Sequence, residues 1–298
     1  MSSRSGLTLV ELVVVLLILV LVAGTAITAS EGLVGETRYE TTRTSLRNIE
    51  RAMLGAFDSS SSGEPTSISF AADIGRLPKV VGTDPQTALA EMWSKPEAVE
   101  PFAIQLAPGD PDVRLPGGWR GPYVRVPIGL GETYLHDGWG RTFQCLQADG
   151  ATLSPIDTEI AMLRSLGANG MDGGMGYDAD LTLTFISTES GTTAARHLGA
   201  VPVRVTNTGT EDTVFIRIYG PREGRIVTLD QVDAKAVGQD FVHVFESVPV
   251  GPRVVRAYLA ASAPVTTDSV FEETVARSRS IPVTVVQGGI PEVLLELP

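Results

Sequence analysis

The stretch GLTLVELVVVLLILVLVAGTAITA, residues 6–29, governs the interpretation of the whole chain, because it is an apolar run with a single charged residue, Glu11. A carboxylate inside a membrane span costs about 2.5–3.5 kcal/mol on insertion scales, so a plain anchor has no use for it. The apolar core of an ordinary secretory signal peptide is likewise uninterrupted and ends at a small-residue cleavage site. The segment therefore indicates a membrane-inserted helix in which Glu11 has a specific task.

A short leader with Arg4, then a glycine, then a carboxylate at a fixed offset in an apolar run resembles the class III leader of type IV pilins and type II secretion pseudopilins. The resemblance implies that prepilin peptidase removes residues 1–6, cutting between Gly6 and Leu7, and methylates the new amine of Leu7. The family usually has Phe where this chain has Leu7. Glu11 would then act in assembly, because it can neutralise the Leu7 ammonium of a neighbouring subunit. Secretory cleavage near the small residues Gly24 and Ala26 is the alternative.

Composition narrows the function classes further. Across 298 residues, 35 Asp and Glu outweigh 23 Lys and Arg, and the net charge of −12 argues against a nucleic-acid partner. Cys145 is the only cysteine, which excludes an intrachain disulfide, and we expect it to be a buried small hydrophobe. The histidines 136, 197 and 243 are far apart, and the sequence contains neither a zinc signature nor a G-x-S-x-G motif. We therefore expect a protein that is not an enzyme.

Residues 30–57 continue the helix with a different pattern. Apolar and small side chains recur at roughly 3.6-residue spacing while arginines occupy the other faces, which predicts an amphipathic helix packed on a domain. The stripe consists of Tyr39, Thr42, Leu46, Ile49, Met53 and Phe57. A continuous helix over residues 7–57 would be about 75 Å long. Its first part, residues 7–29, is the expected membrane-spanning segment.

Residues 58–190 are expected to form a globular domain. A flexible loop, DSSSSGE, follows the long helix, and a short helix is expected from Pro85. The segments GGWRGPYVRVP (117–127) and HDGWGRTFQC (136–145) resemble the W-x-GPY and DPWG-x-PY patterns of the major pseudopilin of type II secretion. The matching residues are Trp119, Gly121, Pro122, Tyr123, Asp137, Trp139, Gly140 and Phe143. Gly138 and Thr142 replace the two prolines. We expect these residues to build the fold rather than to carry chemistry.

Residues 165–181, SLGANGMDGGMGYDADL, combine five glycines with amide and carboxylate side chains. Such a loop exposes oxygens that can converge on a hard cation, and calcium takes six to eight of them. The loop also resembles the calcium loop of the major pseudopilin. The resemblance implies Ca²⁺ ligands among Ser165, Leu166, Asn169, Asp172, Asp178 and Asp180. Asn169 and Met175 stand where that family has acids, which should weaken binding. A glycine-rich turn with solvated aspartates is the alternative.

Residues 198–298 change to a period of two, after a Thr/Ser-rich linker that ends at His197. Strand-like runs begin near residues 201, 214, 241, 253, 281 and 292, with turn signals between them, which predicts an antiparallel β-sandwich. The pieces FESVPVGPRVVRAYL and IPVTVVQGGIPEVLLEL resemble the carboxypeptidase-regulatory, transthyretin-like sandwich family. The expected fold class is α+β: a long N-terminal pilin helix packed on a small antiparallel sheet domain, followed by an all-β sandwich.

Together these resemblances imply a structural subunit of a type II secretion pseudopilus. The subunit would cross the inner membrane once, hold its C-terminal domains in the periplasm, and polymerise into a filament for protein secretion. The expected partners are further copies of the chain, other pseudopilins, prepilin peptidase and the inner-membrane assembly platform. The alternative is a minor pilin or adhesin whose β-sandwich binds protein or carbohydrate, and the sequence leaves open whether the subunit repeats along the filament or caps it. An anchored hydrolase using Asp137 or Asp178 is the weakest candidate, because no nucleophile–base pair stands out.

Overall fold

A computed structural model describes residues 9–55, 68–108, 110–126, 134–189, 192–207, 213–234, 241–260 and 278–297, without the side chains of residues 24–32 and of a few residues at strand ends. Gly6 and Leu7, with the expected cleavage bond between them, lie outside these ranges. The chain divides into two compact units. The first contains the chain up to Ser45 together with residues 136–141 and 165–181, and the second contains the remainder.

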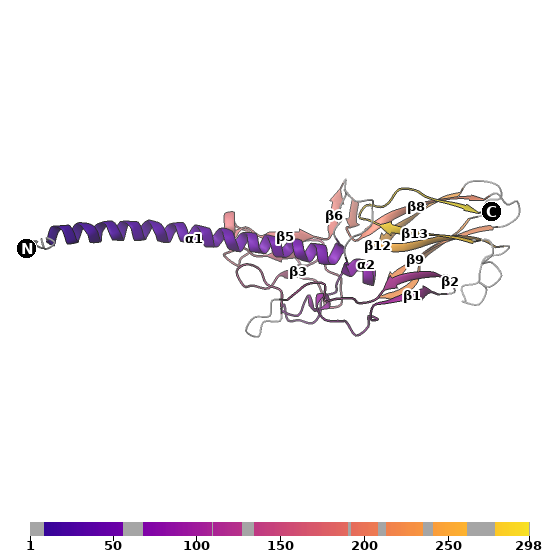
Figure 1. Ribbon diagram of the computed structural model, residues 1–298, viewed down its shortest axis with the longest axis horizontal. Coiled ribbons are helices and arrows are strands. Elements are labelled where there is room, and N and C mark those ends of the chain that lie inside the picture. The colour runs from indigo at the N-terminus through magenta and orange to yellow at the C-terminus, as the bar shows by residue number, and fades with distance from the viewer. Residues whose placement is uncertain are drawn as a thin grey trace, which may run out of the picture. The chain divides into compact units, whose positions relative to one another are not determined.

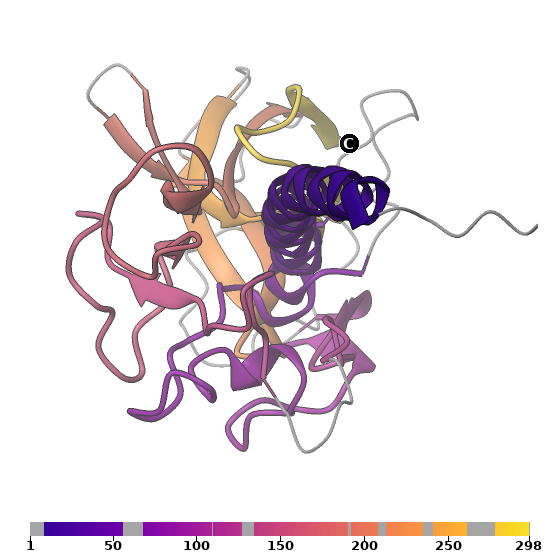
Figure 2. The same ribbon diagram turned by 90° about the vertical axis from the view of Figure 1, so that its left-hand side faces the viewer.

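Helix α1, Leu9–Leu54, is 46 residues long, or about 69 Å at 1.5 Å per residue, and is drawn in indigo and purple in Figure 1. Figure 2 looks nearly down its axis from the Leu9 end. The large apolar side chains between Leu9 and Val22 are all exposed, by 47% to 81% of their surface. Within the described residues, none of the helices combines the length and the apolarity that crossing a membrane requires.

The later part of α1 has the amphipathic pattern that the sequence predicts. Thr42, Leu46, Ile49 and Met53 are buried, and Tyr39 is half-buried, whereas the arginines at 38, 43, 47 and 51 are exposed. Phe57, the last member of the expected stripe, lies outside the described residues. The spacing of buried positions follows the helical period, so this face of the helix packs against the protein.

Short elements follow α1 in the chain, and their bounds are α2 (Phe70–Ile74), the 3₁₀ turn η1 (Ala90–Met92), β1 (Ala103–Ala107), β2 (Asp110–Gly117), β3 (Gln144–Leu146), β4 (Met162–Ser165), the 3₁₀ turn η2 (Gly176–Asp178) and β5 (Leu181–Thr184). Strands β1 and β2 form an antiparallel hairpin, and β3, β4 and β5 form a separate small sheet. The helix expected from Pro85 is limited to turns and to η1. Helix α2 begins where Ser69 accepts a hydrogen bond from the Ala72 amide and ends at the left-handed Gly75.

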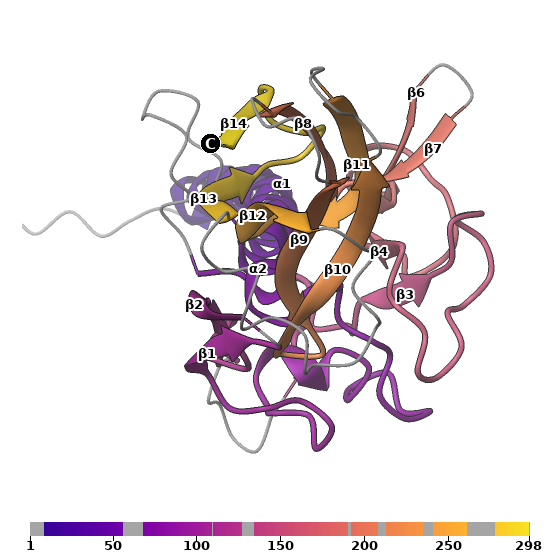
Figure 3. The same cartoon turned by 90° about the vertical axis from the view of Figure 1, so that its right-hand side faces the viewer.

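Two larger sheets fill the C-terminal part of the second unit (Figure 3). One sheet has the order β10-β9-β12-β13, with bounds Arg225–Ala234, Thr213–Arg222, Gly251–Ala260 and Ser278–Val285. The other has the order β11-β8-β14, with bounds Phe241–Pro249, Leu198–Asn207 and Val293–Leu297. Alternate residues from both sheets enter one core, which includes Val203, Ile216, Phe245, Val255 and Leu295. The period-two pattern of the sequence therefore marks the core-facing residues.

Three features of this region differ from the sequence prediction. Strand β10 was not expected at all. Residues 186–195, where a linker was expected, form a hairpin of β6 (Ile186–Glu189) and β7 (Thr192–Ala195). The expectation of a purely antiparallel sandwich is wrong for one pair, because β14 runs parallel to β8. The β-rich component of the expected α+β fold is confirmed, with few helices among the described residues.

The C-terminal sheets share a core with the β1–β2 hairpin. Ala107, Val113 and Leu115 of the hairpin pack with Tyr219, Ile226 and Val254. Arg253 of β12 is fully buried and donates hydrogen bonds to the carbonyl oxygens of Val250 and, at 3.4 Å, of Ala72 in α2. Within the second unit, the sandwich is therefore packed directly on residues 70–117 rather than joined to them by a tether.

An ion network, buried at Arg76 and Glu91 and half-buried at Lys79 and Glu223, lies at the same contact. Arg76, just after α2, pairs with Glu91 at 2.7 Å and with Glu223, in the turn between β9 and β10, at 2.8 Å. Lys79 pairs with the second oxygen of Glu223 at 2.8 Å. Breaking one partner of such a buried set leaves an uncompensated charge, so the network fixes which surfaces can meet.

Burial of His197, between β7 and β8, makes stability depend on pH. Its ring is almost fully buried, its Nδ1 has no hydrogen-bond partner among the described residues, and burial lowers its pKa to about 4. A histidine in an unfolded chain titrates near 6.5. Between about pH 6.5 and pH 4 the unfolded chain therefore binds a proton that the folded chain excludes, and stability falls as the pH falls through this window.

We expect replacement of His197 by Gln to remove this contribution. Between pH 7 and pH 4 the wild-type protein should lose more unfolding free energy than His197→Gln, by at most about 3 kcal/mol, because only the wild type carries the buried imidazole and the Glu159 carboxylate, 3.7 Å from its Nε2, offsets part of the cost of charging it. Chemical denaturation at a series of pH values measures how steeply the unfolding free energy of each protein changes with pH. Equal slopes would contradict the prediction.

Candidate functional site

The first unit brings three segments together: α1 near residues 34–42, the turn at residues 136–141, and the glycine-rich loop at residues 165–181. The loop folds back on itself at two glycines with left-handed backbone. A Cβ at Gly167 would lie 2.8 Å from the Asp178 carbonyl oxygen, and a Cβ at Gly174 would lie 2.5 Å from the same atom. Their φ angles are +60° and +117°, so glycine is needed at both positions for conformation as well as for space.

Asp137 joins the turn to the start of the loop. Its Oδ1 accepts hydrogen bonds from the backbone amides of Trp139 and Arg141, both at 2.9 Å. Its Oδ2 accepts the Ser165 hydroxyl at 2.6 Å. Asp137 and Ser165 are each 1% exposed, so these hydrogen bonds replace the water that a buried carboxylate loses.

Gly138 holds the turn against α1. Its amide donates to Thr42 Oγ1 at 2.8 Å, and a Cβ at this position would lie only 2.0 Å from the Arg38 carbonyl oxygen. Thr42 is completely buried at this contact. A proline here would lack the amide donor and would collide with the helix backbone. This explains why the chain has Gly138 where the related pattern has proline.

Arg141 contacts the loop with its side chain. Its two terminal nitrogens donate to the carbonyl oxygens of Gly167 at 2.5 Å and Ala168 at 3.0 Å. A Cβ at Gly170 would lie 2.8 Å from Arg141 Cζ, so the loop backbone passes directly beside the guanidinium. Sequence analysis missed this role, because nothing in the local pattern around Arg141 indicates a partner 26 residues away.

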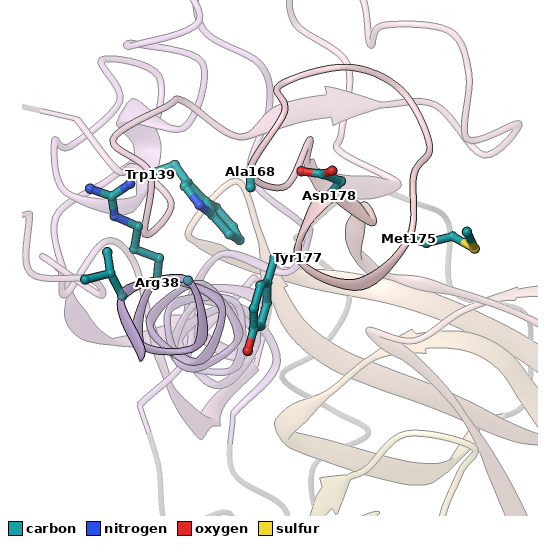
Figure 4. Close-up of a pocket in the computed structure, with 8 residues that line it drawn as sticks. Arg38, Trp139, Ala168, Met175, Tyr177 and Asp178 are labelled. Carbon is teal, nitrogen blue, oxygen red and sulfur yellow. The ribbon is translucent and has the colours of Figure 1, made fainter. Parts of the chain in front are cut away.

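These segments border an open surface pocket of about 630 Å³. It is lined by Val34, Gly35, Arg38, Trp139, Ala168, Met175, Tyr177 and Asp178 (Figure 4). Tyr177 packs on α1. Its ring lies 2.9 Å from where a Cβ would be if Gly35 had one, and the centroids of the Tyr177 and Tyr39 rings are 6.0 Å apart. Figure 4 shows the Arg38 and Trp139 side chains next to each other, with Met175 on the far side of the loop.

The lining combines aromatic, thioether and aliphatic surface with one cation and one carboxylate. Such a surface suits binding of an apolar segment with polar groups at its edge. It offers little for acid–base chemistry. The Ser165–Asp137 pair is too buried to meet a substrate, and the His136 Nδ1 lies 3.0 Å from the Asp137 backbone oxygen.

The six residues expected to bind calcium do not converge as arranged here. Ser165 donates to Asp137, the Leu166 oxygen accepts the Gly170 amide at 3.1 Å, and Asn169 Oδ1 accepts the Met171 amide at 2.8 Å. Asp180 Oδ2 accepts the Gly173 amide at 3.2 Å, and Asp172 and Asp178 are exposed. No group of three His, Cys, Asp or Glu residues in the described ranges is placed to hold a metal. This arrangement does not fit a calcium site, and calcium binding stays a prediction from the resemblance.

The residues expected to build the fold are placed accordingly. Trp119 Nε1 donates to the Glu91 carbonyl oxygen at 3.1 Å, and the Tyr123 hydroxyl donates to Asp73 at 3.0 Å. Asp73, which the sequence analysis did not single out, is buried and also pairs with Arg120. Cys145 is buried as expected, and burial raises the pKa of its thiol to about 12. A thiol held protonated in this way is a poor nucleophile.

Comparison with known proteins identifies no relative. A scan against protein-family models finds no match, and searches of curated proteins and of solved structures return no significant match.

We expect Asp137→Ala to destabilise the protein by about 3 kcal/mol, because three donors, two of them backbone amides, lose a buried charged acceptor. Asp137→Asn should cost less, since its amide oxygen can still accept both backbone N–H groups. Chemical denaturation gives the size of the effect. Asp149→Ala is the control, because Asp149 accepts similar hydrogen bonds from Ala151 and Thr152 on an exposed turn. A loss at Asp137 no larger than the loss at Asp149 would contradict the structural role.

We expect Gly138→Ala to cost about 3 kcal/mol, because the added methyl meets the α1 backbone, which cannot rotate away as a side chain could. Gly140→Ala is the matched control. Gly140 has a left-handed φ of +81°, but a Cβ there meets nothing within 4 Å. The control therefore carries conformational strain without crowding, at about 1 kcal/mol. Denaturation midpoints measured side by side decide the matter, and the prediction fails if Gly140→Ala is the more damaging change.

Proposed function

We propose that this chain is a non-catalytic, helix-anchored subunit that polymerises in the manner of type II secretion pseudopilins. The observation that supports this best is the division of α1 into two chemically different parts. From Leu9 to Val22 its apolar side chains are exposed, whereas Thr42, Leu46, Ile49 and Met53 are buried on one face. An exposed apolar surface of this size needs a lipid or protein environment, because water disfavours it.

In this proposal residues 7–29 lie in the inner membrane before assembly, and the remaining domains lie in the periplasm. Glu11 stands in the first turn of α1 and is exposed, as a group that acts on a neighbouring chain must be. After prepilin peptidase cuts behind Gly6, the methylated Leu7 ammonium of one subunit pairs with Glu11 of another. Each charge alone is costly in an apolar bundle, and the pairing sets the register between subunits.

In this proposal the role of the molecule is mechanical. In the described part of the chain, the Ser165–Asp137 pair and Cys145 are buried, and the pocket beside α1 has no nucleophile–base pair in its lining. Trp119, Tyr123 and Asp137 hold loops in place through hydrogen bonds. The work of the molecule would then be done by association and displacement of whole subunits.

The C-terminal sandwich adds a display surface to this subunit. It shares a core with the β1–β2 hairpin and an ion network with Arg76, so it moves with residues 70–117 as part of the same unit. Any force transmitted through those residues reaches the sandwich directly. This favours a rigid role in the filament or at its end over that of a loosely tethered module.

We expect the mature chain to begin at N-methylated Leu7. The Glu11→Ala variant should be processed normally but should form filaments at least about tenfold less efficiently, since the ammonium that pairs with Glu11 is left unpaired. Mass spectrometry of the membrane fraction identifies the N-terminus, and sheared-filament yield measures assembly. Glu36→Ala, which removes an exposed carboxylate further along α1, is the control and should assemble normally. An unmethylated N-terminus near residues 25–27 would mean a secreted protein and would overturn the proposal.

A further inference from the structure

We propose that the Arg141 guanidinium, rather than a divalent cation, orders the glycine-rich loop of residues 165–181. The inference does not depend on the proposed assembly function. It starts from a mismatch: the loop pattern resembles a calcium loop, yet several of its backbone carbonyl oxygens accept hydrogen bonds from donors within the protein. The strongest of these donors is a permanent cation, since arginine stays protonated throughout the physiological pH range.

The guanidinium is aimed at the loop by its own backbone. The Arg141 amide donates to Asp137 Oδ1 at 2.9 Å, and its carbonyl oxygen accepts the Asp137 amide at 2.8 Å. This closed turn fixes where the Arg141 side chain starts. Its fork then reaches two successive carbonyl oxygens, Gly167 and Ala168, at 2.5 and 3.0 Å. Two donors on one planar group hold two adjacent peptide units in one orientation, which a lysine could not reproduce.

The loop makes room for this contact. At Gly170 a Cβ would lie 2.8 Å from Cζ and 3.0 Å from Nε of Arg141, so any larger residue would push the guanidinium away. Two further carbonyl oxygens of the loop accept hydrogen bonds within it, Leu166 O from the Gly170 amide at 3.1 Å and Tyr177 O from the Ala168 amide at 2.8 Å. A calcium ion would need six to eight oxygens that are free to turn toward it. The internal donors leave the loop closed without one.

The charges of the loop favour the same conclusion. Calcium affinity rises with the number of carboxylate ligands, and positions 169 and 175 carry an amide and a thioether. A divalent ion held by Leu166 or Asn169, the chain neighbours of Gly167 and Ala168, would also be repelled by the guanidinium that contacts the oxygens of those two residues. Arg141 therefore supplies the positive charge that these carbonyl dipoles require.

The contact matters because the loop forms one wall of the pocket. Ala168, Met175, Tyr177 and Asp178 all line it, and the Ala168 oxygen is one of the two atoms that Arg141 holds. The shape of that wall should consequently be independent of calcium supply and sensitive to residue 141. Asp178 and Tyr177 remain the polar groups that such a pocket presents to a ligand.

The test compares full-length wild type, Arg141→Ala and Arg141→Lys in detergent micelles, each with about 1 mM CaCl₂ or with chelator. This calcium concentration lies in the affinity range of extracellular calcium modules. Hydrogen–deuterium exchange is measured for peptides covering residues 165–181. We expect wild-type exchange to be the same under both conditions. Arg141→Ala should exchange about tenfold faster in this loop, with Arg141→Lys in between, because the two charge-assisted hydrogen bonds are lost or halved. Arg114→Ala, which removes an exposed arginine from β2, is the control and should leave the loop unchanged.

Two results would overturn the proposal. Faster loop exchange of the wild type in chelator would mean that calcium orders the loop. Unchanged exchange in Arg141→Ala, with or without calcium, would mean that the glycine-rich turn holds itself. Calcium titration of each protein by calorimetry gives an independent readout, and measurable binding by the wild type with protection of residues 165–181 would also contradict the inference.

Discussion

The buried carboxylate of Asp137 is the interaction on which the first unit depends. It accepts hydrogen bonds from two amides of its own turn and from the Ser165 hydroxyl, 28 residues later. Because a carboxylate that is 1% exposed is stable only when its oxygens are satisfied, all three donors must be in place together. The same turn then presents the Gly138 amide to Thr42 and the Arg141 side chain to the loop. One side chain thus aligns the helix, the turn and the loop.

The second unit depends on buried arginines in a comparable way. Arg253 is fully buried, burial lowers its pKa to about 9, and it donates hydrogen bonds to the carbonyl oxygens of Ala72, Pro252 and Val250. An apolar residue of similar volume would avoid the desolvation of the guanidinium. The arginine, however, can satisfy carbonyl groups at the end of α2 and at the start of β12 that would otherwise be buried without donors. Burying the guanidinium costs stability, but its hydrogen bonds define how the sandwich packs against residues 70–117.

Regular side-chain periods made much of the fold predictable. The helical stripe from Thr42 to Met53 and the alternating residues of β8 and β9 are buried as their spacing predicts, whereas of the alternating residues in β11 only Phe245 is buried and Phe241 and His243 are half-buried. Strand β10 was missed because its register shifts between Thr228 and Asp230, and the bulge places Leu229 and Val232 on the core side in spite of an odd spacing. The β6–β7 hairpin has a loop-like composition, and the direction of β14 cannot be read from alternation. In the pseudopilin-like turn, the pattern identified Asp137 and Trp139, but the contacts of Gly138 and Arg141 depend on segments distant in the chain.

The motif of the glycine-rich loop carries two kinds of information, the path of the backbone and the identity of the group that the loop binds. Its glycines set the backbone path, since Gly167 and Gly174 must be left-handed and must lie against the Asp178 carbonyl whatever holds the loop in place. The group that neutralises the inward-facing carbonyl oxygens is specified elsewhere, by the charge of residues 169 and 175 and by the reach of residue 141. A motif match that rests mainly on glycines therefore predicts the shape of the loop better than its ligand. In this chain the glycines set the backbone path of a loop with few acids, and the Arg141 side chain from the neighbouring turn contacts two of its carbonyl oxygens.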